Sequence, residues 1–321
     1  MSRKVVLVTG AGGFIGRWSV PPLIERGYEV HAVLSRSLKR DIAGQLEGAV
    51  VHAADLLDLE SGLSLMARVK PSHLLHFAWI ATPGTYWASA DNYRWLEASR
   101  HLLGAFKSDG GERVVMAGTS AEYDWTRAGV CDERSSPLAG DLGGTVTPYA
   151  ECKVAMYREL ERFARMEGLS TAWGRIFFQF GPAEDASRLV ASVIINLLAG
   201  REAPCSHGRQ VRSFLHVADV GSAFAALLDS EIQGAVNVGS GEGLPLAEFL
   251  EIIAAQIGRP ELLRLGARSA PLSEPPLLVP AVERLRQELG WQPRFNLQDG
   301  IADTIAWWRE ALAKTSAEAS R

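Results

Sequence analysis

The sequence predicts an α/β fold in which a doubly wound parallel sheet is followed by a smaller, mostly helical lobe. Short β-branched runs alternate with helical patterns through the first half of the chain, as is typical of βαβ units. A glycine-rich loop joins the first strand to the first helix, and the pattern after residue 180 becomes mostly helical. We therefore expect a Rossmann-type sheet with right-handed crossovers and a separate C-terminal lobe.

The first half of the chain supplies the predicted sheet. Strands are expected at 4–10, 29–35, 49–55, 73–79, 113–120 and 170–178. Helices are expected between them at 14–26, 59–69, 91–108 and 148–167. Pro21 and Pro22 fall inside the first helical pattern. Because proline removes a backbone donor and clashes with the preceding turn, we expect a kink or an early break there.

The second half predicts one more strand, over 234–241, and an extended, proline-rich crossing segment over 266–280. Helices are expected at 187–200, 217–229, 246–257, 281–289 and 298–313. These elements divide the chain into two parts and a tail. The Rossmann domain covers 1–178 and is completed by about 208–240, the second lobe covers 179–207 and 241–313, and 314–321 form a flexible tail.

Composition excludes some classes of partner. The chain has 321 residues and a net charge of −4, so it has no global attraction for nucleic acid or for an anionic membrane. Its three cysteines, Cys131, Cys152 and Cys205, are odd in number and widely spaced, which favours a reducing cytosol and no metal site. The N-terminus enters the first strand without a long apolar segment. We expect a cytoplasmic protein without a membrane span.

The loop "VTGAGGFIG" predicts a dinucleotide site in the first domain. Gly10 allows the tight turn, Gly13 lets the backbone approach a pyrophosphate, and Gly16 permits close packing of the helix on the sheet. Phe14 and Ile15 lie between these glycines and belong to the same predicted site.

The end of the second strand bears on the choice of cofactor. A cofactor without a 2′-phosphate usually meets a carboxylate there, but this chain has Ser35 and Arg36. An arginine grips a phosphate well, so NADP is favoured over NAD, the alternative being a solvated basic loop. Asp55 closes the third strand and either receives the adenine amino group or caps the next helix. The remaining predicted cofactor contacts are Leu56, Phe77 and Ala78.

"TPYAECK" places Tyr149 and Lys153 four residues apart at the start of a predicted helix. Residues at i and i+4 share one helix face, so both side chains are able to meet one ligand. A neighbouring ammonium stabilises a phenolate and lowers the pKa of the phenol toward the working range. The pair is therefore predicted to be an acid–base pair, with the lysine also holding a ribose hydroxyl.

An ordered set of motifs resembles a known family. The segments "TGAGGFIG", "HFAW", "GTSAEY", "YAECK", "GP" and "RSFLHVADV" are similar to those of the extended short-chain dehydrogenase/reductase family of NAD(P)-dependent nucleotide-sugar epimerases, dehydratases and ketoreductases. The similarity covers roughly residues 4 to 300. It implies that Tyr149 is the acid–base residue, that Lys153 is its partner, and that Thr119, or its neighbour Ser120, supplies the third hydroxyl. It also implies a homodimer through the helices at 91–108 and 148–167.

The resemblance leaves two reactions open. A 4,6-dehydratase of this family carries Asp and Glu after the catalytic hydroxyl, where this chain has Ser120 and Ala121, so 4,6-dehydration is rejected. One remaining reaction is NADPH-dependent reduction of the 4-keto group of a nucleotide-diphosphate 4-keto-6-deoxy sugar, with Tyr149 as proton donor and Thr119 holding the oxyanion. The alternative is an NAD-dependent nucleotide-sugar 4-epimerase. Ser35 and Arg36 favour the reductase.

Two arginines are expected to hold the anionic part of the substrate. Arg212 matches the family arginine that binds the nucleotide diphosphate, and Arg188 lies on a predicted helix. Ser120 and Trp79 are further predicted substrate contacts. Three positions depart from the family pattern, which usually has Asn, Arg and Asp there; they hold Phe178, Pro271 and Glu274.

Two other classes of function fit the sequence less well. A non-catalytic dinucleotide sensor would be expected to lose Tyr149 or Lys153, and both are present. A reductase of small neutral ketones needs no anion clamp, whereas this chain offers Arg188 and Arg212.

Overall fold

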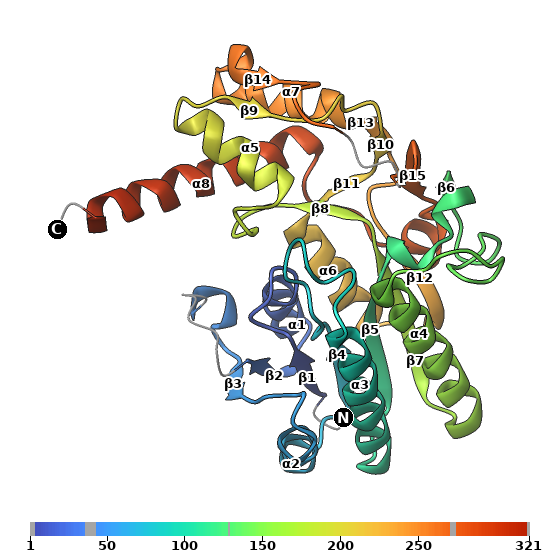
Figure 1. Cartoon of the computed structure of the whole chain (residues 1–321). Coiled ribbons are helices and arrows are strands. Elements are labelled where there is room, and N and C mark those ends of the chain that lie inside the picture. The colour runs from blue at the N-terminus through green and yellow to red at the C-terminus, as the bar shows by residue number, and fades with distance from the viewer. Residues whose placement is uncertain (1–3, 36–42, 128, 270–273, 320–321) are drawn as a thin grey trace.

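The computed structural model describes residues 4–35, 43–127, 129–269 and 274–319. A seven-stranded parallel sheet forms one half of the molecule, with the order β12-β7-β5-β4-β1-β2-β3 (Figure 1). Its strands are β1 (Val5–Thr9), β2 (Glu29–Leu34), β3 (Val50–Ala53), β4 (His73–His76), β5 (Arg113–Thr119), β7 (Ser170–Ile176) and β12 (Gly234–Val238). The strand order reverses beside β1, so the predicted Rossmann-type, doubly wound fold is confirmed.

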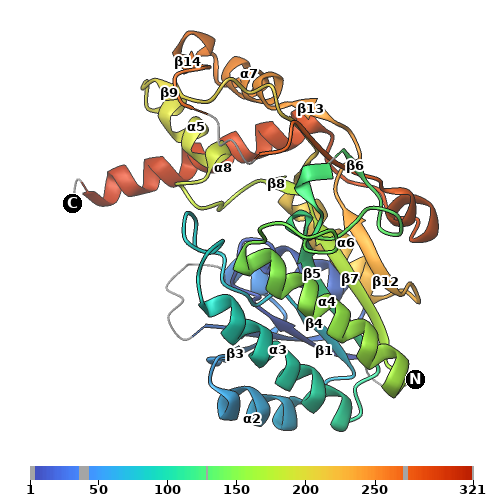
Figure 2. The same cartoon turned by 45° about the vertical axis from the view of Figure 1, so that its right-hand side comes forward.

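Helices cover both faces of this sheet. One layer contains α2 (Leu59–Val69), α3 (Asp91–Ser108) and α4 (Pro148–Glu167), which lie side by side in Figure 2. The other layer contains α1 (Val20–Glu25) and α6 (Val217–Leu228). The side chains of β1 point alternately to the two faces of the sheet. Val6 and Val8 pack in the core beneath α1 and α6, and Leu7 packs beneath α2 and α3.

Two segments of the Rossmann half differ from the predicted pattern. The predicted strand at 170–178 is two strands, because the chain leaves the main sheet after Ile176 and β8 (Phe178–Phe180) pairs with β11 (Phe214–His216). The helical pattern at 14–26 begins as a 3-10 turn, Gly16–Ser19, and becomes α-helical at Val20. Pro21 and Pro22 therefore lie in the first turn of α1, where a missing N–H leaves no hydrogen bond unmade.

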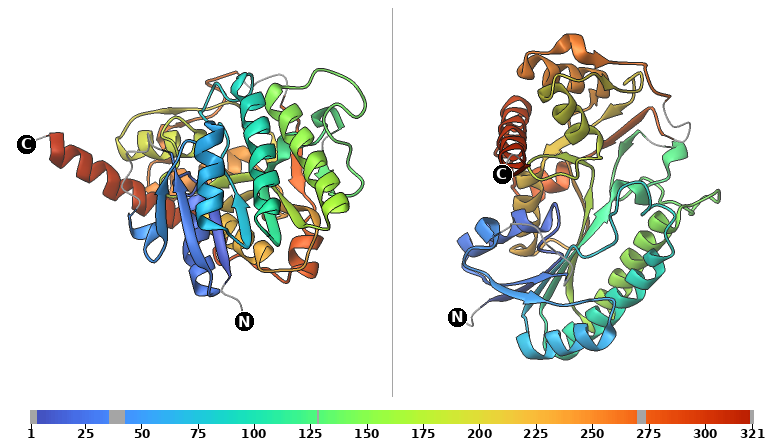
Figure 3. Two further views of the ribbon diagram at one scale, coloured as in Figure 1. Left: turned by 90° about the horizontal axis from the view of Figure 1, so that it is seen from below. Right: turned by 60° about the vertical axis from the view of Figure 1, so that its left-hand side comes forward.

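The second lobe forms its own apolar core above the sheet. Its elements are α5 (Leu189–Leu198), β9 (Ala203–Pro204), α7 (Leu246–Ile257), β14 (Leu263–Arg264) and α8 (Leu297–Ala319). Ile301, Ile305 and Trp308 of α8 are buried in this core. The end of α8 projects away from the lobe (Figure 3). The prediction of a flexible tail from residue 314 is therefore wrong for 314–319, which continue the helix.

A small four-stranded sheet lies where the two halves meet. It has the order β13 (Leu244–Pro245), β10 (Val211–Arg212), β15 (Leu277–Pro280) and β6 (Val130–Cys131). The predicted crossing segment 266–280 thus ends in a strand. The helix predicted at 281–289 is a single π-helical turn, Arg284–Glu288.

Arg113 fastens α6 to the edge of the sheet. Its side chain is buried at the start of β5. The guanidinium donates to the carbonyls of Leu227 at 2.7 Å, Leu228 at 2.9 Å and Ile232 at 2.8 Å, and to the Ser170 hydroxyl at 2.6 Å. These carbonyls lie at and beyond the last turn of α6, where no helical donor reaches them. One side chain therefore satisfies the end of this helix.

Arg113→Met is expected to lower the free energy of unfolding by about 3 kcal/mol, because it removes the Arg113 donors of the Leu228 and Ile232 carbonyls at and beyond the end of α6. Urea denaturation followed by circular dichroism measures the change. The matched control is Arg94→Met, which removes an exposed pair with Asp91 and should shift the midpoint little. Equal midpoints for the two variants would contradict this role of Arg113.

Candidate active site

The glycine loop is shaped by close approaches of the backbone. Gly10 has a φ of +68°, and a Cβ there would lie 2.8 Å from the Ala78 nitrogen. A Cβ on Gly16 would lie 2.3 Å from the Gly10 oxygen. Gly13 is exposed and donates its N–H to the Gly10 carbonyl at 2.9 Å. Side chains are thus excluded at two of the three glycines, which fits a cradle for a pyrophosphate. Phe14 and Ile15 follow in the same loop and are half-buried.

Arg17 supports this loop, and the sequence analysis did not identify it. Its side chain is 2% exposed, and it donates from Nε to the Gly13 carbonyl and from its terminal nitrogen to the Gly12 carbonyl, both at 2.9 Å. The guanidinium offsets two carbonyl dipoles that would otherwise repel a phosphate. No sequence signal separated this buried arginine from a solvated helix residue.

The other predicted cofactor residues follow the carboxyl ends of neighbouring parallel strands. Ser35 follows β2, and Arg36 lies outside the described residues. Asp55 is exposed and accepts the Leu57 N–H at 3.0 Å, so its carboxylate caps the turn before α2. Leu56 beside it is buried. Ser35, Asp55 and Leu56 therefore lie along one edge of the sheet, as the topology requires.

The end of β4 contributes two further predicted cofactor residues. The Ala78 N–H donates to the Thr9 hydroxyl at 3.3 Å, which ties this end to β1. Phe77 is half-buried and packs edge-on against Phe224 of α6, with 4.8 Å between ring centroids.

Tyr149, Thr119 and Lys153 meet at the carboxyl end of β5. Thr147 caps α4 by accepting the Ala150 N–H at 3.3 Å, which places Tyr149 in the first turn. The Thr119 side chain lies near enough to the Tyr149 phenol to lower the pKa of the phenol. Lys153 is buried, and its Nζ donates to the Ala117 carbonyl at 2.9 Å. The structure thus brings the three predicted catalytic residues together.

Ser120, the alternative to Thr119, lies beside this group. It is buried, and its carbonyl accepts the Trp125 Nε1–H at 3.1 Å. Thr119, whose side chain influences the pKa of the Tyr149 phenol, stays the predicted third member of the catalytic group.

The pKa values of the pair depart from the expectation. Burial raises the pKa of Tyr149, and the neighbouring Thr119 side chain opposes this rise. Burial lowers the pKa of Lys153 to about 7. The prediction that Lys153 lowers the phenol pKa is wrong in this structure, because the ammonium is directed to the Ala117 carbonyl and desolvation dominates the pKa of the phenol.

Aromatic side chains surround the catalytic pair. The Tyr86 and Trp87 rings contact the Tyr149 ring edge-on, with centroids 4.8 and 5.5 Å apart. The Tyr149 N–H also donates to the Trp87 carbonyl at 3.2 Å. Trp79 lies beneath Lys153, whose Nζ is 3.9 Å from the ring centroid. The segment before α3 is therefore packed onto Tyr149, which restricts access to its ring.

The two predicted substrate arginines have different partners. Arg188, the N-cap residue of α5, donates to the Ala81 carbonyl at 3.2 Å, and its guanidinium carbon lies 5.9 Å from the centroid of the Tyr86 ring. Arg212 is 4% exposed and lies 3.5 Å from the Glu274 carboxylate. Its guanidinium also stacks on Phe178, 5.2 Å from the ring centroid. Arg188 thus lies beside the catalytic tyrosine, whereas Arg212 is neutralised by one of the residues that depart from the family pattern.

A cavity of about 530 Å³ lies away from these residues. Its lining includes His216, Arg286, Arg294 and Phe295, and none of the predicted catalytic residues. Within the described ranges, no helix is long and apolar enough to cross a membrane. The same part of the chain holds no cluster of three His, Cys, Asp or Glu residues suited to a metal ion.

Comparison with known proteins bears on this site. Residues 6–239 match the model of the NAD dependent epimerase/dehydratase family. The chain belongs to this family. A UDP-glucose 4-epimerase of Azospirillum brasilense is 28% identical, over 98% of this chain and 94% of the relative. A 3-diazoavenalumate denitrifying reductase of a Streptomyces species is 30% identical, over 92% and 98% respectively.

A solved structure shows the same fold. The UDP-glucose 4-epimerase of Thermus thermophilus, in complex with NAD, superposes with a TM-score of 0.80 at 26% identity and covers 95% of this chain and 99% of its own. The predicted family and the enzymatic character of this epimerase/dehydratase are thereby confirmed. The protein is an NAD(P)-dependent enzyme of the oxidoreductase type.

The lowered pKa of Lys153 predicts a pH dependence of stability. Between about pH 7 and pH 10 the unfolded chain holds a proton on this lysine that the folded protein lacks, so stability rises with pH. From pH 7 to pH 9 the wild type should gain about 2 kcal/mol more than Lys153→Met.

Urea midpoints at the two pH values measure this gain. The control is Lys314→Met, at the exposed end of α8, which should keep the wild-type slope. Identical slopes in wild type and Lys153→Met would show that this lysine titrates in its ordinary range.

Proposed function

We propose that the protein is an NAD-dependent nucleotide-sugar 4-epimerase. The observation that carries the proposal is the grouping of Thr119 at the end of β5 with Tyr149 and Lys153, which lie four residues apart on one face of α4. A bound nicotinamide dinucleotide would accept a hydride from the sugar and return it. Gly10 and Gly16, where a Cβ has no room, fit the backbone cradle that such a cofactor needs.

The residues of the chain manage the proton and the sugar oxygen. Tyr149 takes the proton of the 4-hydroxyl as the carbon is oxidised and gives it back when the carbon is reduced. Thr119 holds the same oxygen by its hydroxyl, so the developing carbonyl and alkoxide share one donor site. The first step needs Tyr149 as the phenolate, and the phenol formed in it returns the proton. The raised pKa of Tyr149 favours the phenol of the return step and opposes the phenolate of the first step.

The residues after Thr119 support epimerisation over dehydration. Ser120 and Ala121 are buried there and provide no carboxyl group for the loss of a hydroxyl. A 4-epimerase needs no acid or base beyond the tyrosine, since the sugar only loses and regains hydrogen at one carbon. The 4-epimerase relative that spans nearly the whole chain supports the same choice.

The second candidate is the NADPH-dependent reductase of a 4-keto nucleotide sugar. Ser35 at the end of β2 favours it, because the chain places no carboxylate at the first residue after this strand. The reductase relative from Streptomyces is a further reason to keep it. The homodimer through α3 and α4 stays a prediction in either case.

Tyr149→Phe tests the catalytic assignment. It should lower the interconversion of UDP-glucose and UDP-galactose by about 100- to 10,000-fold, because it removes the acid–base hydroxyl and keeps the ring. The matched control is Tyr93→Phe on α3, whose exposed hydroxyl bonds only Glu151 among the described contacts. Full activity in Tyr149→Phe would exclude the mechanism, and no turnover of either sugar by the wild type would exclude this pair of substrates.

Binding of the reduced cofactors separates the two candidates. Quenching of tryptophan fluorescence is followed while stripped protein is titrated with NADH and with NADPH. An epimerase keeps its cofactor bound, because its reaction has no net oxidation. The proposal of an NAD-dependent epimerase therefore expects NADH to bind at least about tenfold more tightly than NADPH. Tighter binding of NADPH would move the assignment to the reductase.

A further inference from the structure

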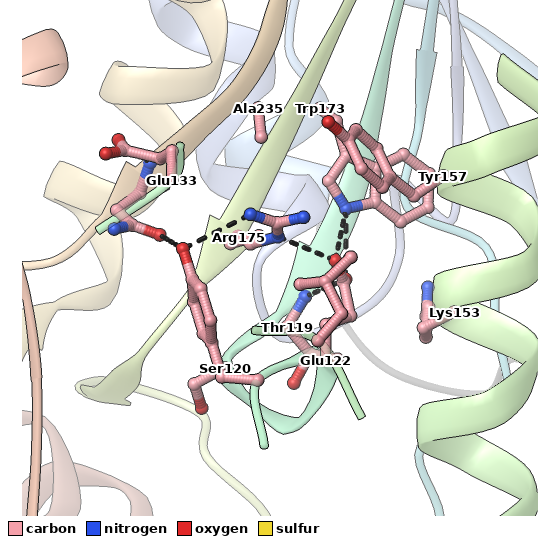
Figure 4. Close-up of polar contacts among 12 residues, drawn as sticks. Thr119, Ser120, Glu122, Glu133, Lys153, Tyr157, Trp173, Arg175 and Ala235 are labelled. Atoms are coloured by element: carbon pink, nitrogen blue, oxygen red, sulfur yellow. Dashed lines mark hydrogen bonds and ion pairs between the residues drawn. The ribbon is translucent and has the colours of Figure 1, made fainter. Parts of the chain in front are cut away.

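A buried ion pair lies directly beneath Thr119. The Arg175 Nε donates to the Glu122 carboxylate at 2.8 Å, and their side chains are 1% and 0% exposed. Figure 4 shows the pair between β5 and β7, with Lys153 on α4 to one side. Burying two charges costs desolvation free energy that apolar side chains of the same size would not cost. A buried ion pair therefore suggests a role beyond filling the core.

The Glu122 carboxylate fixes the backbone of Thr119. Glu122 closes the 3-10 turn Ser120–Glu122, and its carboxylate accepts the Thr119 N–H at 2.7 Å. In return, the Thr119 hydroxyl accepts the Ala121 N–H at 3.2 Å, which completes a capping box. This turn therefore sets the rotamer of Thr119. The rotamer in turn sets the direction of the Thr119 hydroxyl.

Trp173 and Gly118 hold the carboxylate in place from the other side. The Trp173 Nε1–H donates to both carboxylate oxygens, at 3.0 and 2.9 Å. A Cβ on Gly118 would lie 2.1 Å from this nitrogen and 2.5 Å from a Glu122 oxygen. The carboxylate and the indole thus pack against the bare backbone one residue before Thr119.

Arg175 connects the pair to the rest of the site. Its guanidinium stacks between the rings of Tyr123 and Tyr157, with centroid distances of 4.9 and 4.7 Å. It also donates to the Tyr123 hydroxyl at 3.2 Å, which in turn donates to Asn237 of β12 at 2.7 Å. Tyr157 lies on α4, two turns after Tyr149. Strands and helix on three sides therefore hold the pair.

The charge of Glu122 also reaches the catalytic groups. It raises the pKa of Lys153 against the lowering by burial, and it adds to the raised pKa of Tyr149. Arg175, whose guanidinium faces the same carboxylate, limits this field. Glu122 is therefore coupled to the catalytic residues by position and by charge.

We propose that Glu122, held by Arg175 and Trp173, is a positioning residue that orients the Thr119 hydroxyl toward the Tyr149 phenol. Glu122 contacts neither sugar nor cofactor in this proposal and acts only through Thr119. The kinetic test rests on the proposed epimerase function.

Two double variants separate orientation from charge. Glu122→Gln with Arg175→Met removes both charges and keeps an acceptor for the Thr119 N–H. Glu122→Met with Arg175→Met removes the acceptor as well, at nearly the same side-chain volume. We expect kcat to be about 10- to 100-fold lower in the second double variant than in the first, with KM within about twofold.

Adding Thr119→Val to both double variants tests whether the effect passes through Thr119. With that hydroxyl gone, the difference in kcat between them should shrink to less than about twofold. The same difference with and without Thr119→Val would overturn the proposal, because a general structural role does not depend on this hydroxyl. The double variant Glu122→Met with Arg175→Met is the one at risk of not folding. If it does not fold, Glu122→Asp replaces it and is compared with the wild type, because aspartate shortens the side chain by one methylene.

Exchange of the Thr119 amide hydrogen gives a readout that needs no substrate. NMR should show faster exchange in the variant without an acceptor at residue 122 than in the variant with glutamine there. If the wild type turns over neither UDP sugar, the proposed function fails while this comparison still stands. Equal exchange in the two variants would overturn the positioning role.

Discussion

The candidate site depends on the last three residues of β5, which are Ala117, Gly118 and Thr119. The Ala117 carbonyl holds Lys153, the bare backbone of Gly118 admits the indole and carboxylate beneath it, and the Thr119 hydroxyl meets the phenol. Parallel pairing to β7 fixes all three residues at the carboxyl edge of the sheet, just beyond the point where the pairing to β4 ends. The register of the strands thus positions these backbone groups. Helix α4 brings the side chains of Tyr149 and Lys153 to the same edge.

Charges around this edge are balanced in different ways. Arg175 and Arg212 each meet a carboxylate, Glu122 and Glu274 respectively. Lys153 instead bonds to a carbonyl and lies over Trp79, and its pKa falls to about 7. A buried ammonium with only dipoles and a ring as direct partners is sensitive to any ligand that brings hydroxyls or charge. Lys153 therefore differs from the two arginines, each of which already pairs with a carboxylate.

Local sequence patterns predicted much of the fold and of the catalytic group. Apolar periodicity gave the bounds of α2, α3 and α4, and the order of short motifs identified Thr119, Tyr149 and Lys153. Contacts between distant residues were not predictable in this way. Glu122 and Arg175 are separated by 53 positions, and nothing in either neighbourhood indicates the other. The raised phenol pKa was missed for the same reason, because desolvation is a property of the assembled core.

The position of β12 in the chain has a consequence for folding. β12 is the last strand of the main sheet to be synthesised, yet it pairs with β7 and carries the Asn237 that accepts from Tyr123. Until residue 238 has left the ribosome, β7 presents an unpaired edge and the support beneath Thr119 lacks its far anchor. The elements α5, β9 and α6 are synthesised after β7 and before β12. The nascent protein therefore exposes this unpaired strand edge for longer than a sheet whose strands pair in sequence order, and unpaired edges favour aggregation.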